Sequence, residues 1–130
     1  MNLLLDTHAV VWWLDDSDRL GRKARKAIAK PENSAWVSAV SVWEISIKIS
    51  VGRLKFSGIP EVGIASMLDQ GFRSLPVVFD HAFAVRHLPL HHNDPFDRLL
   101  IAQAQCEDFT LMTTDPWMRA YNVRTIDASA

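Results

Sequence analysis

The sequence predicts an α/β fold with a central, mainly parallel sheet, and three observations support this prediction. Short apolar runs alternate with longer segments of helical periodicity along most of the chain, as in strands joined by right-handed helical crossovers. The first run, residues 3–5, is apolar throughout, which suits a strand covered on both faces of a parallel sheet. Acidic residues follow the ends of three apolar runs, at the edge where α/β sheets bind ligands.

The 130 residues are expected to form one domain spanning 1–130, since this length is close to the usual domain size. The net charge of −1 excludes a protein that binds polyanions through its bulk charge, so any nucleic-acid contact must come from a local patch. The single cysteine, Cys106, cannot form an intrachain disulfide, which fits a reducing compartment. With no leader-like or membrane-spanning run, a cytoplasmic protein without membrane contact is expected.

Two strands and three helices are expected in the first half of the chain. The strands are predicted at residues 2–5 and 35–37, and the helices at residues 6–14, 19–30 and about 40–50. The polar stretch 15–18 ends the first helix and is expected to cap the second, whose basic face is interpreted as a solvated face rather than as a surface that guides RNA or receives an acidic partner segment. Ser38 and Ser41 are candidate caps of the third helix, and Gly52 ends it.

The second half of the chain continues the alternation. Strands are expected at residues 75–78, 109–113 and 123–126, and helices at residues 61–70, 80–87 and 94–107, with a short one from residue 115. Pro76 marks its strand as an edge or a strand start, because proline donates no ladder hydrogen bond. Asp94-Pro95 is the best-defined helix start, since proline is favoured at the first helical position.

Four carboxylates lie where an expected strand ends or an expected helix begins, and we predict that they meet in space. They are Asp6, Glu44, Asp97 and Asp115. Charges about 5 Å apart repel by roughly 3 kcal/mol per pair at an effective dielectric near 20, so such a pocket needs a cation. Oxygen-only ligands favour Mg²⁺ or Mn²⁺ and argue against zinc. A metal of this kind polarises water for attack on a phosphodiester.

Each of these acids also has a structural interpretation. Asp6 and Asp115 can be helix N-caps. Glu44 can form a capping box with the serine three residues earlier or an ion pair with the lysine four residues later. Asp97 can be the reciprocal partner of Asp94 in a box, although it lies in line with two apolar residues on the inward side of its helix. Capping and metal binding are compatible, because helix N-termini stabilise negative charge.

Four strings of this sequence resemble the motifs of the PIN-domain ribonucleases, in particular the VapC-type toxins of bacterial toxin–antitoxin pairs. They are Asp6-Thr-His, Glu44 on the helix after the second strand, Asp94-Pro-Phe-Asp97-Arg-Leu-Leu-Ile-Ala-Gln-Ala, and Thr113-Thr-Asp115. The resemblance implies a three-layer α/β/α sandwich and a Mg²⁺- or Mn²⁺-dependent endoribonuclease with a VapB-type antitoxin as its inhibitor. By position, Asp6 and Asp97 are the main metal ligands, and Glu44 and Asp115 complete the acidic pocket.

Other residues are weaker candidates. Three threonines can orient the carboxylates as outer-shell groups, and Arg98 is either a phosphate contact or a solvated side chain; the threonines are Thr7, Thr113 and Thr114. No histidine spacing supports zinc. Most tryptophans, Trp43 included, are expected in the core or in an interface, with Trp13 and Trp117 partly exposed, and the chain is expected to be a homodimer.

Two functions from other classes compete with the ribonuclease. One is a receiver-like signalling module with an acidic Mg²⁺ pocket, but that module needs a lysine at a later strand end, where this chain carries Asp115. The other is a non-catalytic interaction domain whose acids are only caps. Titration with Mn²⁺ separates the latter from the enzyme, since caps alone bind no ion tightly.

Overall fold

A computed structural model, which describes residues 1–130, contains one five-stranded sheet in the order β3-β2-β1-β4-β5. The strands are β1 (Asn2–Leu5), β2 (Ser34–Ser38), β3 (Arg73–Leu75), β4 (Thr110–Thr113) and β5 (Thr125–Asp127). Every pair of neighbouring strands is parallel. The predicted α/β fold with a parallel sheet is therefore confirmed.

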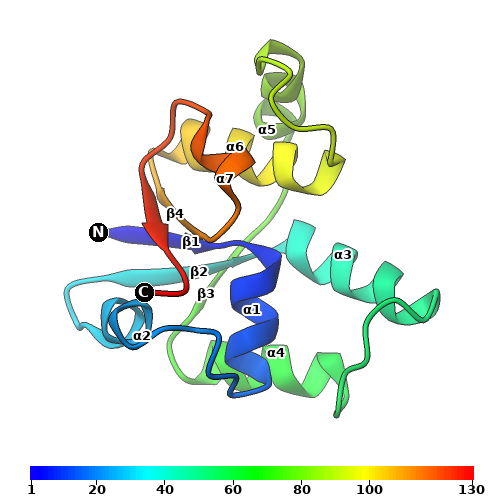
Figure 1. The fold of residues 1–130 in the computed structure, drawn as a ribbon, viewed down its shortest axis with the longest axis vertical. Helices are drawn as coiled ribbons and strands as arrows, with labels where there is room; N and C mark the ends of the chain where they lie inside the picture. Colours follow the sequence, from blue (N-terminus) through cyan, green and yellow to red (C-terminus); the bar gives the residue numbers. More distant parts are fainter.

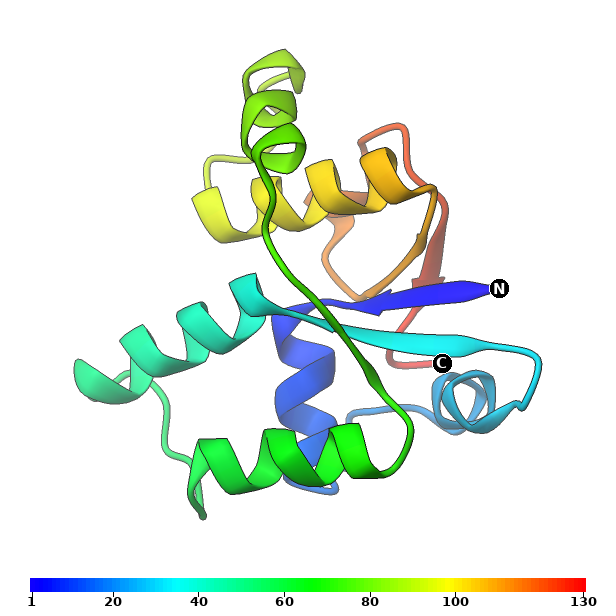
Figure 2. The ribbon, with the colours of Figure 1, turned by 180° about the vertical axis from the view of Figure 1, so that it is seen from behind.

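Seven α-helices and one short 3-10 turn surround the sheet in the predicted three layers. The helices are α1 (Thr7–Leu14), α2 (Arg22–Ala29), α3 (Ala39–Ser50), α4 (Pro60–Asp69), α5 (Phe79–Ala84), α6 (Pro95–Glu107) and α7 (Pro116–Arg119), and the turn is η1 (Val85–His87). In Figure 1, α1, α2 and α4 lie below the sheet, and α5, α6 and α7 lie above it. The reverse view in Figure 2 shows α3 running outward from the end of β2, between these two layers.

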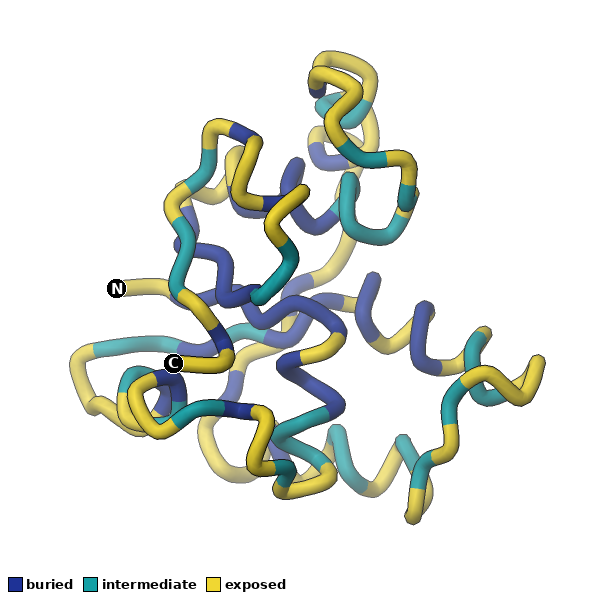
Figure 3. Tube along the Cα trace, in the orientation of Figure 1, coloured by how far each residue is buried: buried dark blue, intermediate teal, exposed yellow.

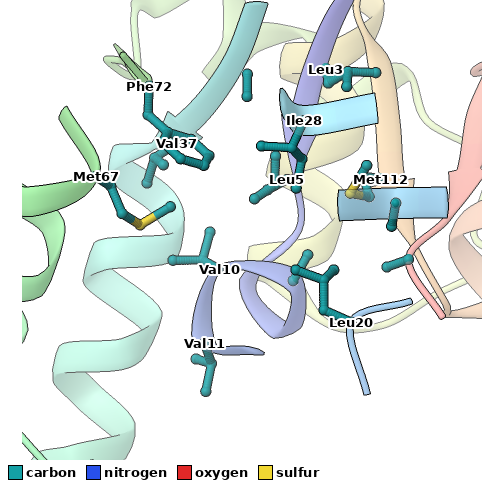
Figure 4. Close-up of a cluster of buried hydrophobic side chains, with 14 of the residues drawn as sticks. Leu3, Leu5, Val10, Val11, Leu20, Ile28, Val37, Met67, Phe72 and Met112 are labelled. Carbon is teal, nitrogen blue, oxygen red and sulfur yellow. The ribbon is translucent and has the colours of Figure 1, made fainter. Parts of the chain in front are cut away.

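The alternation of side chains along each strand builds one core on each face of the sheet. Leu3 and Leu5 join a cluster with α1, α2 and α4, in which Met67 and Phe72 also pack (Figure 4). Leu4, between them, points to the other face and packs with α6 and α7. All three leucines are fully buried, and each such side chain contributes about 1.5–3 kcal/mol through removal from water. A run of three leucines thus places β1 at the centre of the sheet, and Figure 3 shows burial concentrated there.

Two local predictions were wrong, and one of two alternatives was confirmed. The stretch 15–18 does not cap α2; the cap position is Gly21, which has no side chain to donate or accept. The strand predicted at 75–78 is β3, and it ends at Leu75 because Pro76 cannot continue the ladder. Of the two serines offered as caps of α3, Ser38 is the cap, and its hydroxyl accepts from the Val40 amide.

The order of strands brings several chain segments to one edge of the sheet. From β1 the chain moves outward to β2 and β3, then crosses back through α6 to β4 on the other side of β1. Ligands of open α/β sheets bind at such a reversal, beyond the carboxyl ends of the strands. Residues after β1, β2 and β4, together with the start of α6, face this place. None of the helices has the length and apolar character needed to cross a lipid bilayer.

Candidate metal centre

All four predicted acids line one pocket of about 50 Å³ at the carboxyl edge of the sheet. The complete lining is Asp6, Thr7, His8, Glu44, Lys48, Asp94, Asp97, Asp115 and Met118. This volume exceeds the roughly 30 Å³ that one water occupies in the liquid, so the pocket has room for an ion. Larger hollows elsewhere, such as one of about 440 Å³ beside Asp108 and Arg124, hold no comparable group of acids.

Asp6 follows β1 directly and caps α1. The Ala9 amide donates to Asp6 Oδ1 at 2.8 Å, and only 3% of the residue is exposed. Burial raises the pKa of the Asp6 carboxyl, and the nearby Asp115 raises it further, while hydrogen bonds from Thr113 and Ala9 act in the opposite direction. Asp6 is therefore a buried carboxylate whose charge the protein alone compensates only in part.

Glu44 lies in α3 and is held at both oxygens. The Thr7 hydroxyl donates to Glu44 Oε1 at 2.6 Å, and Lys48 Nζ lies 2.6 Å from Glu44 Oε2. The alternative of an ion pair with the lysine four residues later is thus confirmed. The capping box with Ser41 is not formed, because α3 begins at Ala39 with Ser38 as its cap and Ser41 lies inside the helix. The Ser41 hydroxyl instead lies 3.1 Å from the Thr7 hydroxyl, in the same network.

Asp97 occupies the first turn of α6, and the Asp94 side chain caps that helix. The amides of Phe96 and Asp97 donate to Asp94 Oδ1 at 2.8 and 3.2 Å. The reciprocal half of a capping box is absent, because the Asp97 carboxylate turns toward the pocket instead, where His92 Nε2 lies 2.9 Å from its Oδ2. Burial, followed by the charges of Asp94 and Glu44, raises the pKa of Asp97 to about 7.

Asp115 caps α7 with one carboxylate oxygen and faces the pocket with the other. The Trp117 amide donates to Oδ1 at 2.8 Å, and His92 Nε2 lies 3.0 Å from Oδ2. The Asp115 amide donates to the Thr113 hydroxyl at 3.0 Å. The Thr113 hydroxyl therefore contacts Asp115, and Thr113 also lowers the pKa of Asp6.

Four residues at the pocket were not predicted as site residues: His8, Lys48 and Met118 line it, and His92 contacts two of its acids. The sequence indicates Lys48 only as an ion-pair partner of Glu44, and it gives neither His92 nor the other histidines a zinc-binding spacing. His92 lies two residues before Asp94, and its Nδ1 accepts from the Asp94 amide at 3.1 Å. The spacing of His92 from the start of α6 is visible in the sequence, but this spacing does not predict where the imidazole ring points.

Three of the weaker candidates do not line the pocket. Thr113 reaches it only through its contact with Asp115. The Arg98 guanidinium donates to the carbonyls of Val85, Leu88 and Pro89 and to the Tyr121 hydroxyl, so it holds the segment before α6. The Thr114 carbonyl accepts a hydrogen bond from the Arg119 side chain. The basic face of α2 also lies elsewhere, since α2 precedes β2 at the opposite edge of the sheet (Figure 1).

The donors of the pocket fit a hard divalent cation. They are carboxylate oxygens, which Mg²⁺ and Mn²⁺ prefer. The raised pKa values of Asp6 and Asp97 show that these carboxylates are costly to ionise together, and an ion bound between them would remove this cost. Three ligand atoms, one each from His92, Asp97 and Asp115, lie within 4.8 Å of one another.

Comparisons with known proteins agree with the fold and with the predicted resemblance. Ribonuclease VapC22 from Mycobacterium tuberculosis (strain ATCC 25618 / H37Rv) is 29% identical over 120 residues, which cover 92% of this chain and 91% of that protein. A chain of VapBC2 from Rickettsia felis, solved bound to a promoter DNA fragment, superposes with a TM-score of 0.71 at 15% identity, over 97% of this chain and 98% of that one. FitAcB from Neisseria gonorrhoeae gives a TM-score of 0.67 at 20% identity, over 97% of each chain.

At such low identities the superpositions establish the fold alone. The family is established by the sequence, because the model of the PIN domain matches residues 3–127. That range begins inside β1 and ends with β5, so it includes every acid of the pocket. With nearly its whole length matched, this chain belongs to the PIN domain family.

Proposed function

We propose that this chain is a Mg²⁺- or Mn²⁺-dependent endoribonuclease and the toxin of a toxin–antitoxin pair. The observation that carries the proposal is the convergence of Asp6, Glu44, Asp97 and Asp115 on one small pocket, from four distant parts of the sequence. The similarity to a protein named as a ribonuclease supports RNA as the substrate class. No comparable support exists for a receiver-like module.

In this proposal the aspartates hold the ion, and the surrounding residues orient them. Asp6 is fixed by the Ala9 amide and Asp115 by the Trp117 amide, so each presents its carboxylate from a helix start. When bound, the divalent ion would supply a polarised water and positive charge against the scissile phosphate. Asp97, whose pKa is about 7 without an ion, would stay ionised beside one.

Glu44 completes the acidic wall, and Lys48 limits its charge. Because Thr7 and Lys48 occupy both Glu44 oxygens, this carboxylate has a fixed orientation and a paired charge. The Lys48 side chain is 36% exposed and is the one lysine or arginine among the lining residues. We infer that its ammonium reduces the repulsion that an approaching phosphate meets at the pocket mouth.

Two exposed tryptophans adjoin the acids and offer faces for stacking on bases. Trp43 precedes Glu44 and is 55% exposed, so of the two predicted positions the core is excluded and an interface remains; its ring packs edge-on against Phe96. Trp117, two residues after Asp115, is 62% exposed, in line with the prediction of partial exposure. Aromatic stacking binds single-stranded nucleic acid without requiring a basic surface everywhere, which suits a chain with a net charge of −1.

The partners in this proposal are a VapB-type antitoxin, RNA and a second copy of the chain in the cytoplasm. A structural relative from Klebsiella pneumoniae was solved as a toxin–antitoxin complex. Exposed apolar side chains are available for protein contacts, among them Phe79 and Phe83 on α5, which are 81% and 62% exposed. Co-purification with the product of an adjacent short reading frame, and the molar mass of each species by light scattering, test these assignments.

The test of the chemistry is RNA cleavage by the purified chain with Mg²⁺, with Mn²⁺ and with EDTA. Cleavage is expected only with a metal, and Asp6→Asn and Asp97→Asn are each expected to lower the rate by at least about a hundredfold, because several kcal/mol of metal-dependent stabilisation are lost. Asp18→Asn, an exposed aspartate outside the pocket, is the matched control and should cleave normally. Metal-independent cleavage, or full activity of either pocket variant, would contradict the proposal.

Calorimetric titration with Mn²⁺ in the absence of RNA tests the remaining alternative. An interaction domain whose acids are only caps should bind no ion tightly. The proposed enzyme should bind Mn²⁺ in the wild-type chain and lose that binding in Asp97→Asn. Equal Mn²⁺ binding by the two proteins would remove Asp97 from the metal site.

A further inference from the structure

The two nitrogens of His92 have different partners, and this determines what the ring can do. Nδ1 accepts a hydrogen bond from the Asp94 amide at 3.1 Å, so Nδ1 carries no proton. The neutral ring then has its proton on Nε2, and that N–H points between two carboxylates. Nε2 lies 2.9 Å from Asp97 Oδ2 and 3.0 Å from Asp115 Oδ2.

The segment that carries His92 is anchored from two sides. The Tyr121 hydroxyl accepts from the amides of His91 and His92 at 3.2 and 2.9 Å. Arg98 donates to the same hydroxyl at 3.1 Å and to the His92 carbonyl at 3.4 Å. These contacts come from α6 and from the turn after α7, so the backbone of His92 is tied to the two elements that supply its carboxylate partners.

We propose that His92 is a positioning residue, whose Nε2–H holds Asp97 Oδ2 and Asp115 Oδ2 side by side, facing a divalent ion. The inference rests on the proposed function, since it assigns a task within that metal centre. Asp97 lies in the first turn of α6 and Asp115 caps α7. Their carboxylate oxygens lie within 4.8 Å of each other, where two negative charges repel. A shared N–H donor opposes that repulsion and sets the orientation of both groups, as outer-shell donors do for ligating carboxylates.

The same contacts argue against His92 as a metal ligand. Nε2 can bind an ion only with its lone pair, so the ring proton would have to move to Nδ1. There it would face the hydrogen of the Asp94 amide, which Asp94 keeps in place because it caps α6 through the amides of Phe96 and Asp97. The capped start of α6 therefore selects the tautomer that donates to the carboxylates.

The experiment measures Mn²⁺ binding without RNA, by calorimetry and by pulsed EPR of the bound ion. His92→Leu removes the donor and keeps a side chain of moderate size, whereas His92→Gln retains an N–H donor. His92→Leu is expected to weaken Mn²⁺ binding by roughly 10- to 100-fold, and His92→Gln is expected to recover most of that loss. His91→Leu is the matched control, since the His91 ring packs edge-on against Tyr121 and, unlike His92, pairs with neither Asp97 nor Asp115, and the variant should bind Mn²⁺ normally. The EPR spectrum of the wild-type chain should lack the large nitrogen coupling of a directly bound imidazole.

Each contrary result overturns the inference in a recognisable way. Unchanged Mn²⁺ affinity in His92→Leu would remove the positioning role, and equal weakening in His92→Gln would assign the effect to ring packing rather than to donation. A large nitrogen coupling that disappears in both variants would make His92 a ligand. If a variant fails to fold, the EPR measurement on the wild-type chain still tests whether an imidazole binds the ion directly. Absence of Mn²⁺ binding by the wild-type chain would instead refute the proposed function, and the inference with it.

Discussion

Replacing Asp97 by asparagine is expected to stabilise the metal-free protein above neutral pH, although it removes a carboxylate proposed to be essential. Burial, with help from Asp94 and Glu44, raises the pKa of Asp97 from 3.8 to about 7. An acid with a higher pKa in the folded chain binds more protons there than in the unfolded chain. The free energy of unfolding therefore falls as the pH rises between these two values. Asparagine has a similar shape but no ionisable group, so the variant does not lose stability in this way as the pH rises.

The size of the effect follows from the shift. A rise from 3.8 to about 7 is about three pKa units, which corresponds to about 4 kcal/mol at roughly 1.36 kcal/mol per unit. About two of these units fall between pH 5 and pH 8, so the stability advantage of Asp97→Asn should grow by up to about 3 kcal/mol across that interval. For a domain of this size that is roughly 10 °C in Tm.

Urea unfolding in EDTA at pH 5 and at pH 8, followed by tryptophan fluorescence, measures this advantage. Asp18→Asn is the control, because that aspartate is exposed and its replacement should change stability equally at both pH values. Saturating Mn²⁺ should reverse the order at pH 8, since an ion that binds only the folded wild-type chain stabilises it by mass action. A stability difference between Asp97→Asn and the wild type that is independent of pH would refute the reasoning.

Three further substitutions test how the pocket is built. Lys48→Met should destabilise the chain by about 1–3 kcal/mol in chemical unfolding, because it leaves the buried carboxylate of Glu44 without its ion-pair partner. The double variant with Glu44→Gln should recover most of this lost stability, and a failure to recover it would contradict the pairing. Arg98→Ala removes several hydrogen bonds to the segment before α6. Amide hydrogen exchange of that segment should therefore accelerate more than in the control Arg86→Ala. Equal exchange in the two variants would count against the anchoring role. Asp115→Ser keeps a helix cap and loses the charge, so it should abolish Mn²⁺ binding. It should also destabilise the chain by about 1 kcal/mol less than Asp115→Ala does. Mn²⁺ binding by the serine variant would exclude Asp115 as a ligand.

Local signals in the sequence were sufficient for most of the fold. The continuous apolar run of β1 indicated a strand covered on both faces, and Asp94-Pro95 marked the start of α6 where the structure has it. The errors lie where tertiary contacts decide the boundary. Gly21 is a helix cap without a capping side chain, because its amide donates to the Ala128 carbonyl and the amides of the first turn of α2 donate to Ala130. No sequence pattern near residue 21 indicates its contacts with residues 128–130.

The acids of the pocket were predictable because strand ends and helix starts are visible in sequence, and parallel strands bring them to one edge. His92 was not predictable in the same way. Its position depends on the path of the segment before α6, and Tyr121, almost thirty residues later, helps to set that path. Lys48 was visible as a helical neighbour of Glu44, but only the structure shows that its ammonium also lines the pocket.

For Asp6 and Asp115, acting as a helix cap and facing a shared pocket are compatible. Asp6 and Asp115 each accept a backbone amide at Oδ1, and for Asp115 the second oxygen is the one beside His92. A cap therefore uses one oxygen and fixes the direction of the other. Because the helix N-terminus also stabilises the negative charge, the local interaction that begins each helix keeps a carboxylate in place near its neighbours, at a spacing that side chains on a flexible loop would not maintain. Structural capping is thus the means by which the fold assembles a group of mutually repelling acids, and a substitution that preserves the cap but not the charge should separate the two roles.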